Sequence, residues 1–430
     1  MMTHLKIPKD KTMEGSIPLL TEGYEFALHR RQELQSNIFQ TRLLGQTAIC
    51  LGGREGAELF YNNDLFQRGG AIPKRIQKSL FGEKGVQTLD GKAHLHRKQL
   101  FMSLMTPERL GEIAGIVKRQ WQAAALRWES TVQLELFDEA QQVMCRAACQ
   151  WAGVPLREQD VKLISDELGQ MVESFGGLGS RYQEGKQARR HTEQWVSELI
   201  GLIREGRVDV PEQTAAYAMS WHRDTEDQLL DVSTAAVELI NIIRPIVAIG
   251  RYVVFSALAL HDYPEARERL ITSFQTEADR TYSQWFVQEV RRLYPFTPIL
   301  GAQVKKDFEW NGYHFPQGTM VILDVYGTTH DPQLWQEPNQ FNPARFADWD
   351  GSPFDLIPQG GGDHRNDHRC AGEWLTIDVM RVSLEFLATQ LTYDVPAQDL
   401  SIDLSRMPAI PASRFIMSHA RLKPPYSNII

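Results

Sequence analysis

The chain has 430 residues, of which 42% are hydrophobic and 10% aromatic, so it can bury a large core. Its formal charge of -8 comes from interspersed residues without a long basic run, which argues against a nucleic-acid partner. The four cysteines have neither the spacing of a disulfide framework nor a CxxC pair, so we expect a protein of the reducing cytoplasm.

Nothing in the sequence divides it into separate units. No Pro/Gly/Ser-rich linker, low-complexity tract or internal repeat is found, and a single domain over residues 1–430 is therefore predicted. The first 20 residues include lysines but no long apolar segment, so we expect neither a signal peptide nor a membrane anchor, and a soluble protein.

The first hundred residues combine short helices with strands. Residues 23–35 are expected to form a helix, and residues 39–63 alternate around Gly52-Gly53 as in a β-hairpin. A glycine-punctuated loop over residues 81–87 begins at Phe81 and ends at Gln87.

The remainder of the chain is mostly helical in its hydrophobic period. The expected helices include residues 107–128, 136–151, 158–171 and 189–203. Cys145 and Cys149 lie four residues apart on one of them, where packing on a shared face is the simpler explanation. The sequence thus predicts a mostly α protein with a minor β part.

A basic helix precedes these segments. His94 and Lys98 are four residues apart on a helical run that continues through Met105, so they share a face. Taken alone, this pattern is also that of a solvated basic helix surface.

The longest helical run is expected from residue 225 to residue 261. It starts at Thr225 with the pattern of a capping box, and its middle contains Arg244 and Pro245 among isoleucines. A guanidinium in such surroundings is costly unless an anion compensates it, either an internal carboxylate or a bound ligand. Arg251, seven residues on, is our example of the first case.

Two further charged patterns follow. Glu289 and Arg292 are three apart on a helix that runs from residue 282 and is stopped by Pro295, and Arg345 follows a β-rich stretch. By itself such a pair is usually a solvated ion pair of little energetic weight.

Cys370 lies where a loop with three glycines, Gly360 to Gly362, enters a helix. A helix start favours a thiolate, which a metal ligand or nucleophile requires. Three interpretations compete: a buried structural thiol, a zinc ligand together with His364 and His368, and an axial thiolate to haem iron.

These segments, in this order, resemble the cytochrome P-450 superfamily. The similarity covers nearly the whole chain and rests on Cys370-Ala371-Gly372, on Glu289-x-x-Arg292 and on Arg345. The Gly-Gly-Gly-Asp-His lead-in and Arg244-Pro245 are similar to the fatty-acid peroxygenase branch, although Gln359 and His368 depart from the common cysteine loop.

The resemblance implies a cytochrome P-450 fold that holds heme b, with Cys370 as the axial thiolate ligand of the iron. It also implies that His94 and Lys98, with Arg68 as a weaker candidate, hold the haem propionates. Phe81 and Phe296 would line the channel for an acyl chain.

The branch further implies the chemistry. Arg244 would hold the carboxylate of a fatty acid, which would then serve as the acid–base group for hydrogen peroxide, since no Ser or Thr lies between Thr234 and Ser256. The expected reaction is hydroxylation at the α or β carbon without a redox partner protein, and Gln87 favours hydroxylation over decarboxylation.

Three other functions remain open from the sequence. They are a fatty-acid decarboxylase that gives terminal alkenes, a reductase-dependent monooxygenase of the same fold, and a non-catalytic haem protein that binds a ligand.

Overall fold

The computed structural model describes residues 5–276 and 281–424. Its α-helices are α1 (Ser16–Glu22), α2 (Phe26–Leu34), α3 (Gly53–Phe60), α4 (Lys74–Ile76), α5 (Gly91–Ser103), α6 (Pro107–Trp128), α7 (Leu136–Ala152), α8 (Val161–Glu173), α9 (Ser180–Arg204), α10 (Ala215–Trp221), α11 (Val232–Asp262), α12 (Pro264–Thr276), α13 (Thr281–Leu293), α14 (Val325–Thr329) and α15 (Glu373–Glu385). Its strands are β1 (Ile38–Leu43), β2 (Gln46–Leu51), β3 (Phe66–Gln67), β4 (Gln133–Glu135), β5 (Ile299–Val304), β6 (Phe308–Trp310), β7 (Tyr313–Phe315), β8 (Met320–Asp324), β9 (Leu391–Asp394) and β10 (Ile416–Leu422). Short helical turns include η2 (Gln77–Phe81), η3 (Val86–Thr88) and η5 (Pro343–Phe346).

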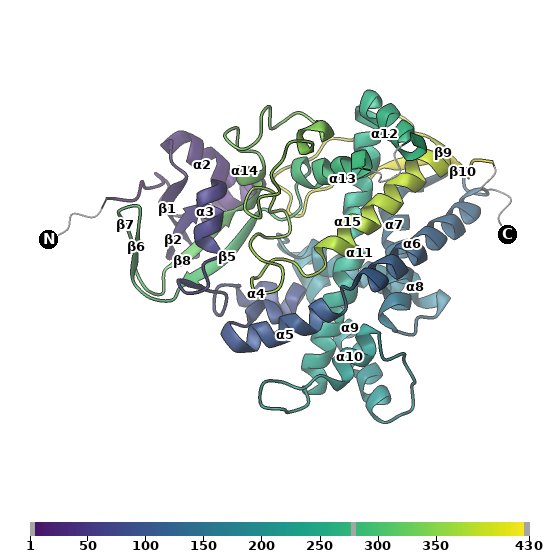
Figure 1. Cartoon of the computed structure of the whole chain (residues 1–430), viewed down its shortest axis with the longest axis horizontal. Helices are drawn as coiled ribbons and strands as arrows, with labels where there is room; N and C mark the ends of the chain where they lie inside the picture. The colour runs from purple at the N-terminus through teal and green to yellow at the C-terminus, as the bar shows by residue number, and fades with distance from the viewer. Residues whose placement is uncertain (1–4, 277–280, 425–430) are drawn as a thin grey trace.

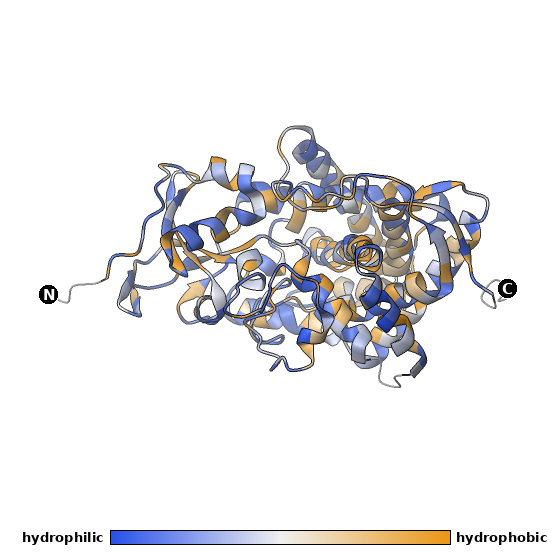
Figure 2. Cartoon of the chain, turned by 90° about the horizontal axis from the view of Figure 1, so that it is seen from above, coloured by the Kyte–Doolittle hydropathy of each residue, from blue (hydrophilic) through white to orange (hydrophobic). Residues whose placement is uncertain are grey.

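The strands β1, β2, β5, β6, β7 and β8 lie toward the N-terminal end, whereas β9 and β10 lie among the helices at the opposite end (Figure 1). The largest sheet has the order β1-β2-β8-β5-β3, in which β2 pairs with β8 in parallel and the other pairs are antiparallel. One continuous apolar core runs through the helical end, and Figure 2 shows hydrophobic residues concentrated on the central helices. The predicted mostly α fold with a minor β part is confirmed.

The helix α11 is the axis of the helical end. Asp231 caps its first turn by accepting from the backbone N–H of Thr234 at 2.9 Å, and almost every residue from there to Leu260 is buried. It packs on α7, α9 and α15. By length and composition alone α11 could cross a membrane, but 78% of its most apolar window is buried inside the fold, as in a core helix.

Three sequence expectations about element boundaries are wrong. The hairpin of β1 and β2 turns at Leu44 and Gly45, and the Gly52-Gly53 pair instead opens α3. The expected capping box at Thr225 lies in a turn where the Asp224 side chain accepts backbone N–H groups, so α11 starts seven residues later. The helix expected over 189–203 begins nine residues earlier, at Ser180.

The charged pattern on α13 forms a buried network. Glu289 accepts two hydrogen bonds from Arg292, at 2.7 and 2.8 Å, and a third from Arg345 Nε at 3.1 Å. Arg292 also donates to the carbonyl oxygens of Thr329 and Pro338. The network fixes α13 against η5, which places α13 beside α15 and the loop that precedes it.

Candidate active site

The loop before α15 presents Cys370 at the entrance to that helix, as the sequence predicts. Gly360 and Gly362 have φ values of 89° and 79°, and a Cβ on Gly360 would lie 2.8 Å from the hydroxyl oxygen of Tyr61. The Cys370 N–H donates to the carbonyl oxygen of Gln359 at 3.0 Å, and the Gln359 amide lies 3.7 Å from Sγ. The loop therefore holds the thiol in a defined position.

Glu373, in the first turn of α15, ties this loop to the rest of the fold. Its carboxylate is paired with Arg291 of α13, with Arg369 Nε at 2.6 Å and with His364 Nε2 at 3.0 Å. Burial opposes its ionisation, but these partners outweigh burial and hold the pKa of Glu373 well below its usual range. The cysteine loop is thus anchored by a buried charge.

Burial raises the pKa of the Cys370 thiol and has the largest effect on it. Nearby Lys98 and, at the helix start, the backbone N–H of Gly372 lower this pKa, the latter in the direction that the sequence indicates, but they only partly oppose burial. A thiolate here requires a cation at the sulfur atom, and a metal ion bound by the thiol would provide one.

The two histidines of the zinc alternative, His364 and His368, are each engaged in a ring contact. The His364 ring stacks on Trp374 at 4.2 Å, and the His368 ring stacks on His94 at 3.8 Å. Within residues 5–276 and 281–424, no group of three His, Cys, Asp or Glu side chains is arranged to hold a metal ion.

Basic side chains converge beside the cysteine loop. Lys98 of α5 donates to the carbonyl oxygen of Arg369, the residue before Cys370, and burial lowers its pKa. Arg68 is buried over the Phe60 ring, 4.0 Å from its centroid, and His94 is buried with its pKa lowered to about 4 by burial. In the described part of the chain, none of the three forms an ion pair with a carboxylate.

This arrangement fits a haem, which brings two propionate carboxylates of its own. Buried cations without anionic partners are costly, and propionates would compensate Arg68 and Lys98. The thiol of Cys370 beside them fits the axial ligand of the iron.

Arg244 of α11 is buried, with 5% of its surface exposed. Its Nε has no hydrogen-bond partner, its Nη2 makes one long contact of 3.4 Å to Asn241 Oδ1, and the guanidinium lies 5.5 Å from the centroid of the Phe81 ring. Burial lowers the pKa of Arg244 to about 9, Arg189 acts in the same direction, and Cys370 opposes both. Among the described residues no carboxylate pairs with Arg244.

The structure brings Gln87, Phe81 and Arg244 together. Asn241, one turn before Arg244 on α11, donates to Gln87 Oε1 at 3.3 Å and to the carbonyl oxygen of Phe81 at 3.0 Å. Pro245 follows Arg244 inside the helix. The ring of Phe296 stacks on Tyr252 of α11, with the ring centroids 5.1 Å apart.

Sequence reasoning missed three residues of this region: Arg97, Glu238 and Asn241. Arg97 Nη1 donates to Glu238 Oε1 at 2.6 Å, and Glu238 Oε2 accepts from Asn241 at 3.3 Å. The sequence did contain a signal. Glu238 is a carboxylate in an otherwise apolar helix, and Asn241 and Arg244 follow it on the same face, three and six residues later.

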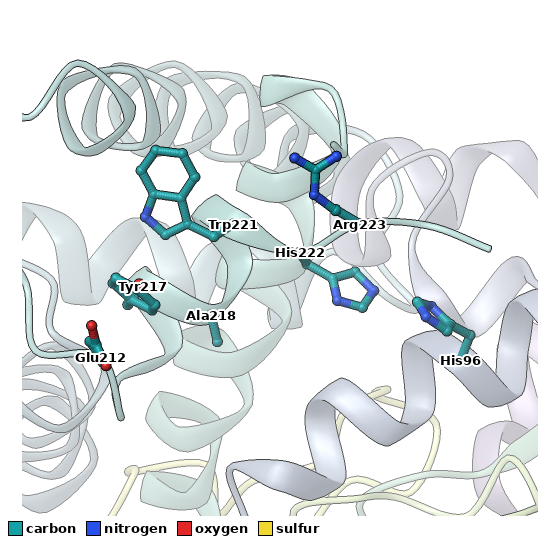
Figure 3. A pocket seen from close by; sticks show the side chains of 7 residues that line it. All are labelled: His96, Glu212, Tyr217, Ala218, Trp221, His222 and Arg223. Atoms are coloured by element: carbon teal, nitrogen blue, oxygen red, sulfur yellow. The ribbon is translucent and has the colours of Figure 1, made fainter. Parts of the chain in front are cut away.

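A surface hollow beside α10 lies apart from these residues. Figure 3 shows His96 and His222 facing each other across part of it, with ring centroids 4.9 Å apart. None of the site residues predicted from the sequence lines it.

Comparisons with known proteins agree with this geometry. The family model for Cytochrome P450 matches residues 265–402. The putative cytochrome P450 120 of Synechocystis sp. is 24% identical, with 88% of each chain covered. Cytochrome P450 3A16 of Mus musculus is 28% identical over 44% of this chain, and the match spans only 40% of that mouse protein.

Solved structures match far more completely. Cytochrome P450EX alpha (CYP152N1) with myristic acid is 46% identical, covers 97% of this chain and 100% of its own, and gives a TM-score of 0.93. Cytochrome P450SP alpha (CYP152B1) in complex with (R)-ibuprophen is 43% identical over 95% of this chain and 99% of its own, with a TM-score of 0.92. A variant of cytochrome P450 OleT in complex with arachidonic acid is 40% identical over 97% and 99%, with a TM-score of 0.93.

Full-length likeness at this identity, together with a cysteine loop and basic side chains that fit a haem, shows the family. The chain belongs to the cytochrome P450 family, in the branch of the CYP152 enzymes.

Proposed function

We propose that the protein hydroxylates fatty acids at the α or β carbon with hydrogen peroxide as the oxidant. The observation that carries the proposal is Arg244, a buried guanidinium for which no carboxylate partner exists among the described residues. A buried cation of this kind is compensated by an anion from outside the chain. The acidic end of a fatty acid supplies that anion.

Arg244 binds and orients the substrate. Its guanidinium presents parallel N–H donors, which match a carboxylate in bidentate geometry. Phe81, whose ring lies below the guanidinium, adds apolar surface next to the acid group. The relatives crystallised with myristic and arachidonic acids support an acyl substrate of this type. Holding the acid end restricts which carbons come close to the oxidant, namely Cα and Cβ.

The bound carboxylate also supplies the acid–base group that the helix lacks. Between Thr234 and Ser256, α11 offers no hydroxyl side chain. A carboxylate held by Arg244 accepts a proton from one oxygen of hydrogen peroxide and returns it to the other. Arg244 stabilises the ionised form of this carboxylate and so keeps it deprotonated, which is the form that can accept a proton.

The remaining site residues hold the cofactor. We assign Cys370 as the axial ligand of a heme b, and Arg68, His94 and Lys98 as the groups that face its propionates. When bound, the haem supplies the oxidising chemistry at the substrate carbon. Hydrogen peroxide carries the oxygen atom and also the two electrons that a reductase would otherwise supply. The chain then needs no surface for an electron donor, so we propose no redox partner protein.

Gln87 supports hydroxy acids over terminal alkenes as products. Its side chain contacts Asn241 and is not titratable near neutral pH, so it cannot deliver a proton as an imidazolium could. Decarboxylation remains the second candidate among products.

The direct test incubates the haem-loaded protein with hydrogen peroxide and saturated fatty acids of several chain lengths, followed by mass spectrometry. We expect 2- or 3-hydroxy acids as the main products. Turnover with NAD(P)H and a reductase but none with peroxide would establish a monooxygenase instead. Haem binding without any oxidised product would point to a ligand-binding protein.

A further inference from the structure

A line of polar contacts runs through the apolar interior from α5 to the loop that contains Gln87. It begins at Arg97, whose Nη1 donates to Glu238 Oε1 at 2.6 Å; the side chain of Glu238 is fully buried. The second oxygen of Glu238 accepts from Asn241 Nδ2 at 3.3 Å. Asn241 then contacts both Gln87 and Arg244, at 3.3 and 3.4 Å.

The donors and acceptors in this line have one consistent direction. Burial raises the pKa of Glu238, but the ion pair with Arg97 at 2.6 Å favours its carboxylate form. This form can only accept hydrogen bonds, so Asn241 must turn its Nδ2 toward Glu238. The same Nδ2 group then faces Gln87 Oε1, and the amide oxygen of Asn241 is left to face the Arg244 guanidinium, which can only donate. Gln87 in turn keeps its Nε2 donor directed away from Asn241.

Local packing holds this arrangement in place. A Cβ on Gly85 would lie 2.9 Å from both Asn241 Nδ2 and Gln87 Oε1, so the loop approaches α11 closely only because this residue is glycine. The Phe81 carbonyl oxygen accepts a further hydrogen bond from Asn241 at 3.0 Å, and the Val86 backbone N–H donates to Glu238. The three acceptors around Asn241 Nδ2 outnumber its two N–H groups and must share them, but all three favour the same orientation of the amide.

We propose that Glu238 is a positioning residue for the substrate: through Asn241 it fixes the direction of the hydrogen bonds that aim Arg244 and the amide N–H groups of Gln87 at the fatty-acid carboxylate. This inference rests on the proposed function, because it takes a carboxylate as the ligand of Arg244. Glu238 itself does not contact the substrate, yet through this line it selects a head group that is anionic and can only accept hydrogen bonds.

The substitution Glu238→Gln tests the direction of the line. Arg97 is charged and attracts the amide oxygen of the new glutamine, whose amide nitrogen must then face Asn241. The Asn241 amide then has no consistent orientation: its present one sets Nδ2 against that amide nitrogen, and the reverse one points Nδ2 at Arg244 and its oxygen at the Phe81 carbonyl. We expect a weaker grip on the carboxylate while the overall shape of the site is unchanged.

The experiment measures the dissociation constant of myristic acid for the haem-loaded protein by calorimetry, in wild type, Glu238→Gln, Asn241→Ala and the double variant. Each single substitution should raise the constant roughly three- to tenfold, the range of one ordinary hydrogen bond. The double variant should bind no more weakly than the weaker single one, because Glu238 acts only through Asn241. Additive effects overturn the proposal.

Glu173→Gln is the control, since the half-buried Glu173 is also paired with an arginine of α11, Arg251, but has no contact with Asn241. It should lower stability and leave the dissociation constant unchanged. If Glu238→Gln fails to fold, Asn241→Ala still tests the proposal, because this variant keeps the Arg97–Glu238 pair. An unchanged dissociation constant of myristic acid in Asn241→Ala overturns the proposal.

The outcomes separate this inference from the proposed function. Wild type that binds myristic acid but does not oxidise it with peroxide contradicts the proposed function alone. Wild type that oxidises the acid, with uncoupled effects of the two substitutions, contradicts the role of Glu238 alone. Absence of any fatty-acid binding to wild type overturns both.

Discussion

Arg244 and Arg251 lie seven residues apart on α11, both buried, yet among the residues that the structure describes only Arg251 is paired with a carboxylate. Arg251 donates to Glu173 and, at 2.6 Å, to the carbonyl oxygen of Ala409. Arg244 has one long contact, to the Asn241 amide. Arg251 thus stabilises the fold, whereas Arg244 on the same helix is available to a ligand.

This contrast predicts opposite consequences for the two arginines. Arg244→Ala should weaken fatty-acid binding by about 2 to 5 kcal/mol and abolish peroxide-driven oxidation, while haem content and the melting temperature stay close to wild type. Arg251→Ala should lower the melting temperature, because it removes a buried partner of the half-buried Glu173 and leaves a cavity. Calorimetric binding and thermal unfolding of both variants check this, and reversed results would contradict the assignment.

A short carboxylic acid should act as a decoy in wild type. It fills the site at Arg244 and replaces the substrate as the acid–base group, so that a non-acidic substrate such as styrene is oxidised with peroxide. The rescue should depend on the acid concentration and be absent from Arg244→Ala. Equal rescue in the variant would mean that the acid acts elsewhere.

Cys370→Ala should lose the thiolate-type absorption of the carbon monoxide complex. Cys370 alone combines the glycine loop with a helix start and lies beside Lys98. Cys50→Ala is the control, since Cys50 is buried in β2, and should keep that spectrum. Retention of the spectrum in Cys370→Ala would show that another residue ligates the iron.

Gln87→His should shift the products toward terminal alkenes. The imidazole introduces a group that can carry a proton near neutral pH at the position next to Asn241 and Arg244. Gas chromatography of the products from one fatty acid gives the ratio of alkene to hydroxy acid. An unchanged ratio would show that this position does not decide the product.

The network on α13 should be a major source of stability. Glu289→Gln removes a fully buried charge that faces two arginines, and we expect a loss of about 3 to 5 kcal/mol in the free energy of unfolding. Asp160→Asn breaks the exposed pair with Arg157 and should leave the free energy unchanged within error. Urea unfolding of the two variants provides the comparison.

His330 should make the fold less stable in mild acid. Burial, and secondarily Arg292, lower the pKa of His330 to about 3, whereas the unfolded chain has the usual histidine value of about 6.5. The unfolded state therefore binds a proton first, so stability is complete above pH 6.5 and is lost as the pH falls toward 3. At pH 5 this one group accounts for roughly 2 kcal/mol.

His330→Gln is the test of that slope. The variant should lose less stability than wild type between pH 7 and pH 5, as measured by urea unfolding at both values. Parallel losses in the two proteins would assign the acid sensitivity to other groups.

Much of the fold could be predicted because its signals are local. The helix at residues 107–128 has both of its ends right, since Thr106 caps it and its apolar period is regular. The hairpin turn was misplaced because Gly52-Gly53 is the stronger glycine signal, whereas the chain turns at Leu44-Gly45, with Leu44 itself at positive φ.

The site was predictable only in part for a physical reason. Cys370 could be singled out from its immediate neighbours in sequence, and Arg244 and Gln87 could be proposed from theirs together with the family resemblance. The partners of these residues, by contrast, depend on which elements meet in space: Arg97 reaches Glu238 across 141 residues, and no local pattern indicates that contact. The same holds for the absence of a carboxylate near Arg244 in the described chain, which only the assembled fold reveals.

The pairing of Glu373 with Arg291 bears on the order in which the molecule assembles. The two residues are 82 positions apart, and Arg291 belongs to the same helix as the network of Glu289 and Arg292. Contacts of such long sequence separation form late, because the intervening chain must first be confined. The Arg291–Glu373 pair holds the cysteine loop only when α13 and α15 are docked, so we expect haem uptake to report on the completion of folding.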